Sequence, residues 1–334
     1  MPATEILNRD RQINDHLIRD HLVQRRQRLA AVVDPPRHPD LTRLLLSVDS
    51  ALERLAQGDW GACAVCHEPV ESDRLLADPL VSVCLGCLTP EQRRALEHDL
   101  ETAARIQAAL LPPPRVERSG WEIARVYEPL GTVSGDYVDV VEPADGEGTL
   151  IAFGDVAGKG VAAAMVMSQL HALLRSLIRL ELPLPELMER TNALLLASTT
   201  ASSYATLVVA RLGDDGALEI ANGGHLPPLV VHAEGVRPLP ITGVPVGLLP
   251  EVRFQTLETR MEPGETLLLF TDGLSEAPDA AGSEFGPRRV GATAARHHGA
   301  AAPAMLATLR NDLDAFLSGS PRVDDLSLMA VRRR

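Results

Sequence analysis

The sequence predicts an α+β fold. Short runs of β-type residues recur after residue 120, and only a few long helical patterns interrupt them. The runs do not alternate regularly with helices, which argues against a doubly wound sheet and favours sheets packed together with helices outside. Before residue 115 the pattern is charged and helical, and it contains two closely spaced cysteine pairs. These observations divide the chain into a helical, cysteine-bearing region and a larger α+β domain.

The N-terminal region, residues 1–57, is predicted to form two helices. Apolar residues are spaced among many charges over residues 4–33, which is typical of an amphipathic helix. The prolines of Asp34–Pro36 are expected to end it, and Asp40 is expected to cap a second helix that runs to Gln57. The two helices would form a hairpin or pair with a second copy.

Four cysteines form two Cys-x-x-Cys pairs within residues 58–88. They are Cys63 with Cys66 and Cys84 with Cys87, joined by a loop of 17 residues. This spacing is typical of a structural zinc site, because two such turns direct four thiolates at one centre. Disulfides are the alternative, but they need an oxidising compartment, and the charged first thirty residues lack a signal-peptide pattern. We expect one structural Zn²⁺ and a cytoplasmic protein.

A helix is predicted over residues 90–111, within a linker at 89–114. Thr89 suits the N-cap, and Pro90 suits the first turn. Its apolar seam repeats at the spacings of a coiled coil and consists of Leu96, Leu100, Ala103, Ile106 and Leu110. The last two members are expected to be buried against the following domain or a second copy, which would make a homodimer through the N-terminal and linker helices. The alternative is a passive linker.

The α+β domain is expected to span residues 115–334. Its β-type runs lie at 121–128, 136–142, 149–155, 204–212, 217–222, 228–232, 252–259, 265–271 and 325–332. Its helical patterns lie at 159–180, 184–198, 286–298 and 301–317. No run of eighteen apolar residues occurs, so no membrane-spanning helix is predicted.

The charge balance argues against general nucleic-acid binding. The net charge is −13, which disfavours contact with phosphate backbones. Arg25, Arg26 and Arg28 form a local basic patch, which we interpret as a solvated helix face because such a run is short for a nucleic-acid arm. Nucleic acid and membrane are therefore not expected as partners.

Aspartates lie at or near the ends of several apolar strand-like runs. They are Asp136, Asp155, Asp272 and the adjacent Asp324 and Asp325. Each alone would suit a turn, but carboxylates at several strand ends can converge at one edge of a sheet. Hard oxygen ligands favour Mg²⁺ or Mn²⁺. Two such ions could bind a phosphate and activate a water for attack on it.

Ordered motifs in this region resemble the metal-dependent (PPM-type) serine/threonine protein phosphatases, in their bacterial SpoIIE/RsbU-like branch. The resemblance covers roughly Ala103 to Arg332, and its motifs are Ala104–Pro112, Gly135–Tyr137, Gly154–Gly160, Asn222–Pro228, Gly243–Gly247, Thr271–Gly273 and Asp324–Ser327. It implies an α-β-β-α sandwich with metal ions at one end of the paired sheets. Gly223 departs from the pattern, because the family more often has Ala there.

The resemblance also implies roles for the acidic residues. Asp155 would bridge two Mn²⁺ or Mg²⁺ ions, and the backbone carbonyl of Val156 would bind one of them. Asp272 and Asp324 would complete the second site, and Asp136 would act through water or at an outer metal position. The first aspartate of the last motif is the family's ligand, so Asp324 is chosen over its neighbour.

Three other residues in these motifs are candidates. Lys159 is the only lysine among 32 basic residues, so a site could require its compact charge, although chance survival is the alternative. It would steady the phosphate or the loop that carries Asp155. His225 could be a general acid for the leaving oxygen, but we prefer a role in orienting the turn that begins at Asn222.

The cysteine module has a resemblance of its own. Gly61–Val70, Arg74–Leu75, Val83–Cys87 and the preceding Leu52–Gly58 resemble the four-cysteine finger of DksA/TraR-type proteins. Those relatives bind RNA polymerase, but the acidic tip motif of their helical hairpin is not evident around Pro35–Leu41. A zinc-containing spacer or sensor that fixes the phosphatase helix is the preferred interpretation.

These motifs predict a bacterial phosphoserine/phosphothreonine protein phosphatase. By family, its substrate would be a phosphorylated STAS-domain anti-sigma-factor antagonist, which once dephosphorylated would bind an anti-sigma kinase. One alternative is a regulator that binds RNA polymerase or other transcription machinery through the zinc region. Another is a metal-dependent nuclease, which the acidic charge disfavours.

Overall fold

The computed structural model describes residues 18–19, 22–31, 39–71, 74–75, 78–142, 148–199 and 203–334. The chain divides into two compact units, Met1–Asp99 and Leu100–Arg334. Within the predicted 4–33 helix, residues 22–30 are helical. Much of the rest of that segment, and the expected stop at Asp34–Pro36, lies outside the described residues.

The N-terminal unit contains α2 (Pro39–Gln57). Leu22 packs against Val48, Ala51 and Leu55 of this helix in a small apolar cluster. Asp40 was predicted to be the N-cap of this helix, which is wrong, because Asp40 lies inside the first turn. Pro39 begins the helix because its fixed φ suits the first helical position and it has no N–H to satisfy. Asp40 still interacts favourably with the positive end of the helix dipole.

The helix α4 (Pro90–Leu110) crosses the boundary between the units. Its predicted N-cap is confirmed, because the Thr89 hydroxyl accepts a hydrogen bond from the Gln92 amide at 3.2 Å. The Gln92 side chain accepts one from the Thr89 amide at 3.0 Å in return. This reciprocal pair is a capping box, which satisfies two backbone donors at the start of the helix.

The C-terminal unit is a four-layer sandwich, as the resemblance implied. The five-stranded sheet contains, in spatial order, β3 (Asp136–Val141), β4 (Thr149–Val156), β5 (Ala205–Leu212), β6 (Ala217–Gly223) and β9 (Leu257–Arg260). The six-stranded sheet contains β1 (Arg115–Arg118), β2 (Trp121–Glu128), β11 (Leu326–Arg333), β10 (Thr266–Phe270), β7 (Leu229–His232) and β8 (Gly235–Pro238). Every ladder between neighbouring strands in these sheets is antiparallel.

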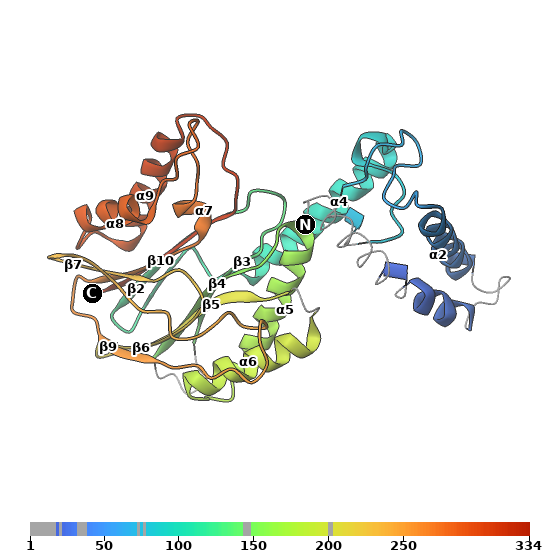
Figure 1. Ribbon diagram of the computed structural model, residues 1–334. Helices are drawn as coiled ribbons and strands as arrows, with labels where there is room; N and C mark the ends of the chain where they lie inside the picture. The colour runs from blue at the N-terminus through green and yellow to red at the C-terminus, as the bar shows by residue number, and fades with distance from the viewer. Residues whose placement is uncertain are drawn as a thin grey trace, which may run out of the picture. The chain divides into compact units, whose positions relative to one another are not determined.

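Helices cover the outer face of each sheet (Figure 1). They are α5 (Gly160–Ile178) and α6 (Leu184–Ser198) on the five-stranded sheet, and α8 (Pro287–Arg296) and α9 (Ala302–Leu317) on the six-stranded sheet. Alternation along β10 shows how the layers form. Leu268 and Phe270 pack toward the helices, whereas Leu267 and Leu269 pack between the sheets, because successive side chains of a strand point to opposite faces.

Most predicted elements are confirmed within a few residues, but three predictions about strands need correction. The short strands β1 and β8 were missed, and both lie at sheet edges with few fully buried residues. The run predicted at 252–259 forms a strand only from Leu257 onward. Before that point the chain turns aside and buries Phe254, whose ring packs so closely on Gly243 that a Cβ there would lie 2.5 Å from it.

The helix α5 is long and apolar. Among the described residues it is the one helix that length and composition would allow to cross a bilayer. Its apolar character has another explanation in this structure, because Met167, Leu170 and Leu174 pack in the core against the five-stranded sheet. A core helix of this kind can have the length and apolar composition of a membrane-spanning helix.

An ion pair between the partly exposed Arg175 and a buried carboxylate joins α5 to β3. Asp139 is fully buried, and its carboxylate accepts hydrogen bonds from Arg175 Nε at 2.7 Å and Nη2 at 2.6 Å. The Tyr137 hydroxyl donates to the same carboxylate at 3.1 Å. This pair was not predicted, and it fixes the first helix of the outer layer over the strand that begins at Asp136.

We predict that Arg175→Met destabilises the protein. The substitution leaves the Asp139 charge buried without its partner, which should lower the free energy of unfolding by about 3 kcal/mol. Arg190→Met is the control, because Arg190 and Glu186 form an exposed pair on α6 whose loss should cost less than about 1 kcal/mol. Urea unfolding measures both values, and equal losses for the two variants would contradict the prediction.

Candidate active site

The predicted aspartates gather at one end of the two sheets. Asp136 begins β3 and lies opposite Asp155 in the β3–β4 ladder. Asp272 follows β10 and begins the short helix α7 (Asp272–Ser275), and Asp324 precedes β11. Because β10 and β11 are paired, each sheet contributes two carboxylates from adjacent strands.

Hydrogen bonds between the sheets hold these strand ends together. The Thr271 hydroxyl donates to Asp136 Oδ2 at 3.3 Å, and it accepts from the Ser327 amide at 3.1 Å. The Tyr127 hydroxyl donates to the Asp136 carbonyl at 3.4 Å. Thr271, which follows β10, and residues of β11 and β2 thus bind or support the first residue of β3.

The carboxylates repel one another in a largely buried place. Burial, followed by the charge of Asp155, raises the pKa of Asp136 well above its usual range. Burial, followed by the charges of Asp272 and Asp324, raises the pKa of Asp155 to about 7. Burial and then Asp324 also raise the pKa of Asp272. A bound cation would relieve this repulsion, as it does wherever carboxylates share a metal site.

Glycine keeps room beside two of the predicted metal ligands. A Cβ on Gly135 would lie 3.2 Å from the Val156 carbonyl oxygen and 3.5 Å from Asp155 Oδ1. Both oxygens therefore face the same small space next to Gly135. Carboxylate and carbonyl oxygens are the donors that Mg²⁺ and Mn²⁺ prefer, so this donor set fits such an ion.

A second glycine allows α7 to approach β11. A Cβ on Gly273 would lie 1.7 Å from the carbonyl oxygen of Asp325. Any larger residue would push the start of α7 away from the last strand, and Asp272 would move with it. The Asp-Gly sequence therefore reflects close packing at the site rather than the turn chemistry that it would suit by itself.

The adjacent aspartates differ in their contacts. Asp325 Oδ1 accepts from the Leu130 amide at 2.6 Å, and its Oδ2 accepts from the Gly135 amide at 3.3 Å. Asp324 Oδ2 instead accepts from Lys159 Nζ at 2.6 Å. Asp325 therefore orders the loop before β3, while Asp324 lies beside an exposed cationic side chain.

Lys159 lies within this acidic group. It precedes the first residue of α5, and its Nζ also donates to the Val323 carbonyl at 3.2 Å. The hydrogen bond to Asp324 raises the pKa of Lys159, so the group is charged at neutral pH. The side chain remains more than half exposed, which leaves it within reach of an anion at the site.

His225 and Asn222 form a buried link between the sheets. Asn222 Oδ1 accepts from the His225 amide at 2.8 Å, and its Nδ2 donates to the His225 carbonyl at 3.1 Å. The His225 ring bonds Phe270 of the six-stranded sheet through Nε2 at 3.2 Å and Thr206 of the five-stranded sheet through Nδ1 at 2.8 Å. Both ring nitrogens are therefore engaged, and neither is available to protonate a leaving group.

The tautomer of His225 follows from these partners. A carbonyl can only accept, so Nε2 carries the hydrogen that is donated to Phe270 and Nδ1 accepts from the Thr206 hydroxyl. Burial lowers the pKa of His225 to about 4. The ring is thus neutral at pH 7, which agrees with an orienting role in the turn and gives no support to general-acid catalysis.

Sequence reasoning missed Gln107, which binds the loop before Asp136. This residue of α4 is 4% exposed. Its Nε2 donates to the Ser134 carbonyl at 2.7 Å, and its Oε1 accepts from the Ser134 amide at 3.0 Å. One signal could have shown it, because a glutamine beside the apolar seam offers both a donor and an acceptor.

The predicted burial of Ile106 against the following domain of the same chain was wrong. We expected it to be buried against the following domain, but it is 61% exposed, while Leu110 is partly buried. The buried backbone of Ser134 needs a polar partner, which turns Gln107 rather than Ile106 toward the domain. Contact of Ile106 with a second copy stays a prediction.

The four cysteines gather in the N-terminal unit. Their sulfur atoms all lie within 4.8 Å of one another, and this is the one such group of three or more His, Cys, Asp or Glu donors in the described residues. Cys66 and Cys84 are 3.6 Å apart, close to the roughly 3.8 Å expected in a tetrahedral zinc–thiolate site. Backbone N–H groups of Cys66 and Cys84 lower the pKa of Cys63 to about 6, so the group could hold a metal ion.

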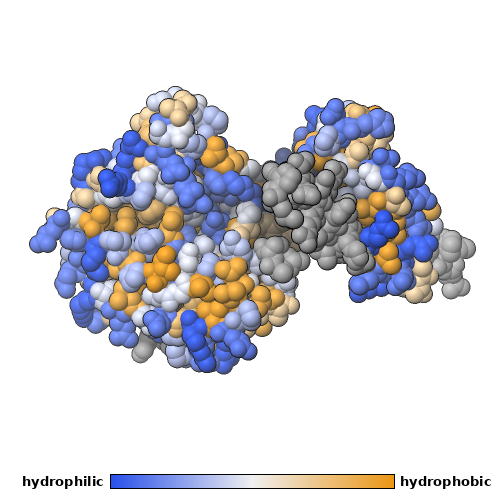
Figure 2. Space-filling model, viewed as in Figure 1, coloured by the Kyte–Doolittle hydropathy of each residue, from blue (hydrophilic) through white to orange (hydrophobic). Residues whose placement is uncertain are grey.

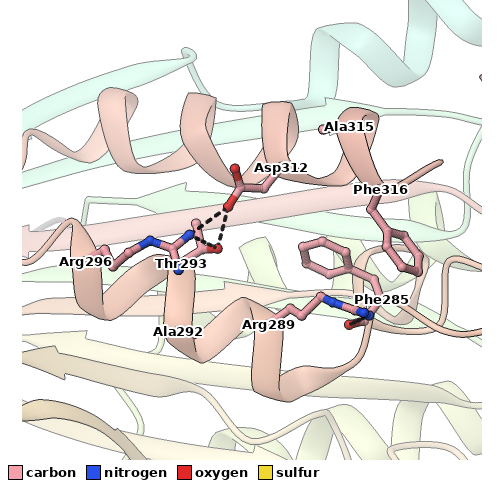
Figure 3. A pocket seen from close by; sticks show the side chains of 8 residues that line it. All are labelled: Phe285, Arg289, Ala292, Thr293, Arg296, Asp312, Ala315 and Phe316. Carbon is pink, nitrogen blue, oxygen red and sulfur yellow. Dashed lines mark hydrogen bonds and ion pairs between the residues drawn. The ribbon is translucent and has the colours of Figure 1, made fainter. Parts of the chain in front are cut away.

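In a separate cavity between α8 and α9, each charged side chain already has a partner within the protein (Figure 3). Its volume is about 370 Å³, and none of the site aspartates lines it. Arg296 forms an ion pair with Asp312 at 3.1 Å, and the Arg289 guanidinium lies 4.6 Å from the centre of the Phe316 ring. We assign no ligand to it.

We predict that His225 makes stability depend on pH. Its pKa is about 4 in the folded chain against about 6.5 when unfolded. As pH falls below 6.5 the unfolded chain gains a proton that the folded chain does not, so the free energy of unfolding should decline by roughly 3 kcal/mol toward pH 4. Urea unfolding of the wild type and of His225→Asn at several pH values measures the contribution of His225 to this pH dependence.

Exposed His298 provides the control for that measurement. His298→Asn should keep the wild-type pH dependence between pH 6.5 and pH 4, whereas His225→Asn should weaken it. An NMR titration that places the pKa of His225 above 6 would contradict the burial argument.

Curated relatives match this chain over much of its length. Protein IcfG of Synechocystis is 29% identical over 264 residues, which cover 70% of this chain and 41% of the relative. Phosphoserine phosphatase RsbU of Bacillus subtilis is 26% identical over 187 residues, which cover 55% of each chain. The chain therefore spans about half the length of these curated relatives.

The fold is also found in solved structures. The SiaA-PP2C domain of Pseudomonas aeruginosa superposes with a TM-score of 0.62 at 22% identity, covering 72% of this chain and 98% of that one. A sequence model described as stage II sporulation protein E (SpoIIE) matches residues 145–334. The match contains Asp155, Asp272 and Asp324 and covers more than half of the chain, which therefore belongs to the SpoIIE family.

Proposed function

We propose that this chain is a metal-dependent phosphoserine/phosphothreonine protein phosphatase. The observation that carries the proposal is the convergence of Asp136 and Asp155 from one sheet with Asp272 and Asp324 near the other. Their mutual repulsion raises the pKa of Asp155 to about 7. Such a group suits the binding of cations better than any role in stabilising the fold. Family membership and the name of the relative RsbU support the same reaction.

The proposed ligands are the oxygens already described. Asp155, the Val156 carbonyl, Asp272 and Asp324 would hold two Mn²⁺ or Mg²⁺ ions, and Asp136 would act through water or at an outer position. Bound ions would supply neutralisation of the phosphoryl oxygens and a water of lowered pKa. In the reaction a water oxygen forms a bond to phosphorus, the bond from phosphorus to the seryl oxygen breaks, and that oxygen takes up a proton.

Residues of this chain would position the reacting groups. Lys159 lies beside Asp324 at 2.6 Å, where its charge would help hold the phosphoryl group. Asn222 and His225 would keep the turn and the adjoining strand ends in place rather than touch the substrate. Asp325 would hold the loop before β3 through the Leu130 and Gly135 amides.

For the substrate we propose a phosphorylated STAS-domain anti-sigma-factor antagonist. The resemblance to the SpoIIE/RsbU-like branch supports it, and removal of the phosphate would let that protein bind an anti-sigma kinase. We place the protein in the cytoplasm, which the four free thiols support. The proposed organisation is a helical region at 1–57, a zinc finger at 58–88, a linker at 89–114 and the phosphatase domain at 115–334.

One prediction of this proposal tests the metal mechanism. Phosphate release from a phosphorylated STAS-domain protein and from p-nitrophenyl phosphate should require Mn²⁺ or Mg²⁺. Asp155→Asn and Asp272→Asn should each lower turnover by roughly 100-fold or more, because loss of a ligand removes charge stabilisation at the reacting phosphate. Exposed Asp314 gives the matched control, and Asp314→Asn should be unaffected. Full turnover in EDTA would refute the mechanism.

Another prediction concerns the cysteines, which we propose bind one structural Zn²⁺. The purified protein should contain about one zinc per chain, the stoichiometry of a closed four-thiolate site. Cys63→Ser should lose the metal and make residues 58–88 sensitive to protease, because metal binding and folding are coupled there. Exposed Ala64 lies in the same turn, so Ala64→Ser should retain the zinc.

Activity toward p-nitrophenyl phosphate separates the zinc region from catalysis. The Cys63→Ser variant should still hydrolyse this small ester, since the carboxylates belong to the other unit. Metal analysis that finds no zinc, together with oxidised cysteines after reducing purification, would contradict the zinc assignment. Zinc-independent phosphatase activity combined with tight binding to RNA polymerase would favour the transcription-machinery alternative for this region.

A further inference from the structure

Three hydroxyl side chains form a row across the six-stranded sheet. Ser327 of β11 is paired with Tyr127 of β2, and the Thr271 amide, just after β10, donates to the Ser327 carbonyl at 3.1 Å. The outer two members of this hydroxyl row both bind Asp136. The Tyr127 hydroxyl donates to its carbonyl and the Thr271 hydroxyl to its carboxylate. Ser327 is the middle member.

The Ser327 side chain lies between the two sheets. Its neighbours on β11, Leu326 and Leu328, pack toward the outer helices, whereas Met329 packs between the sheets. Successive side chains of a strand point to opposite faces, so Ser327 shares the inner face with Met329. The hydroxyl is therefore directed toward the sheet whose first strand begins at Asp136.

Ser327 acts on the Asp136 carboxylate. Burial and then the charge of Asp155 raise the pKa of Asp136, whereas the side chain of Ser327 lowers it, as a nearby donor does when it favours the charged form. The Thr271 hydroxyl bonds Oδ2 of the same carboxylate at 3.3 Å. The Asp136 carboxylate therefore lies against both Thr271 and Ser327.

The Ser327 hydroxyl forms no regular hydrogen bond in the part of the chain that the structure describes. It is close enough to affect the pKa of Asp136 but does not bond it in this geometry. The residue is 1% exposed, so bulk water does not satisfy the hydroxyl. Buried polar groups are rarely left in this condition. A serine hydroxyl has one hydrogen to donate, and the acceptor beside it is Asp136.

Thr149 provides a comparison within the same domain. Its hydroxyl is also buried and forms no hydrogen bond among the described residues. It begins β4, six residues before Asp155, or roughly 20 Å along the strand. The viewed surface of this unit mixes apolar and hydrophilic residues (Figure 2), and Thr149 and Ser327 are at most 1% exposed. Ser327 differs from Thr149 in lying beside a site carboxylate.

We infer that Ser327 is a positioning residue that holds the Asp136 carboxylate for the proposed ions, an inference that rests on the proposed metal-dependent phosphatase function. Asp155 lies directly opposite Asp136 in the β3–β4 ladder, so the two side chains share one face of the sheet. A hydroxyl fixes the orientation of a carboxylate without cancelling its charge. Loss of a residue that orients a metal ligand typically lowers metal affinity or activity by roughly 10–100-fold.

The test measures Mn²⁺ binding by isothermal titration calorimetry and turnover of p-nitrophenyl phosphate, both with the full-length chain. Ser327→Ala removes only the hydroxyl oxygen and should weaken Mn²⁺ binding by roughly tenfold or more, with a similar loss of kcat at saturating Mn²⁺. Ser327→Thr keeps a hydroxyl and should restore most of both values. Thr149→Val removes a buried hydroxyl far from the site and should match the wild type.

Stability separates positioning from a packing role. Without added Mn²⁺, Ser327→Ala should unfold in urea at the wild-type concentration or above it, because the substitution removes a buried hydroxyl that has no regular hydrogen bond. A less stable Ser327→Ala chain with unchanged Mn²⁺ affinity would show that Ser327 only supports the fold. That result would overturn the inference, as would wild-type affinity and turnover in Ser327→Ala.

The same measurements distinguish this inference from the proposed function. A wild-type chain could bind Mn²⁺ yet release phosphate from neither p-nitrophenyl phosphate nor a serine-phosphorylated STAS-domain protein. That outcome would count against the phosphatase function, and the Mn²⁺ affinities of the variants would still decide the role of Ser327. A wild-type chain that binds no Mn²⁺ would overturn both.

Discussion

The structure depends on holding mutually repelling carboxylates together in a mostly buried place. Burial and neighbouring charge raise the pKa of Asp136 and of Asp155, so without a counter-charge the site opposes the folding of the sheets that form it. The rest of the domain must offset this cost. Extensive apolar burial between the sheets and under both helix layers does so, and it leaves the strand ends free to carry groups that serve chemistry rather than stability.

The polar residues around the site fix the positions of the strand ends rather than add stability. Thr271 bonds Asp136 across the gap between the sheets, and His225 joins Thr206 to Phe270 in the same way. Each link satisfies buried polar groups on both sheets, as buried polar groups require. A shift of one sheet against the other would break several of these bonds at once, so they hold the carboxylates at a fixed spacing.

The sequence predicted the fold and the acidic residues because both follow from local patterns. Buried strands such as β10 read directly as apolar runs, and each Asp lies where such a run ends. The edge strand β1 could not be read, since its sequence, Arg115–Arg118, is mostly charged and its pairing with β2 determines its conformation. The contacts of Asp325 were equally hidden, because its partners lie 190 or more residues away in the sequence.

The buried residue of α4 is Gln107 and not, as the apolar spacing predicted, Ile106. This difference matters for how α4 could affect the acidic site. Apolar spacing identifies the side of a helix that avoids water, but it ignores the needs of the surface that the helix meets. Here that surface presents both backbone polar groups of Ser134, two residues before Asp136. Any displacement of the end of α4 would therefore pull on the residue that leads into the acidic site. Since α4 begins in one compact unit and ends in the other, the amide of Gln107 is a contact through which movement of this helix would reach the loop that leads into the carboxylates.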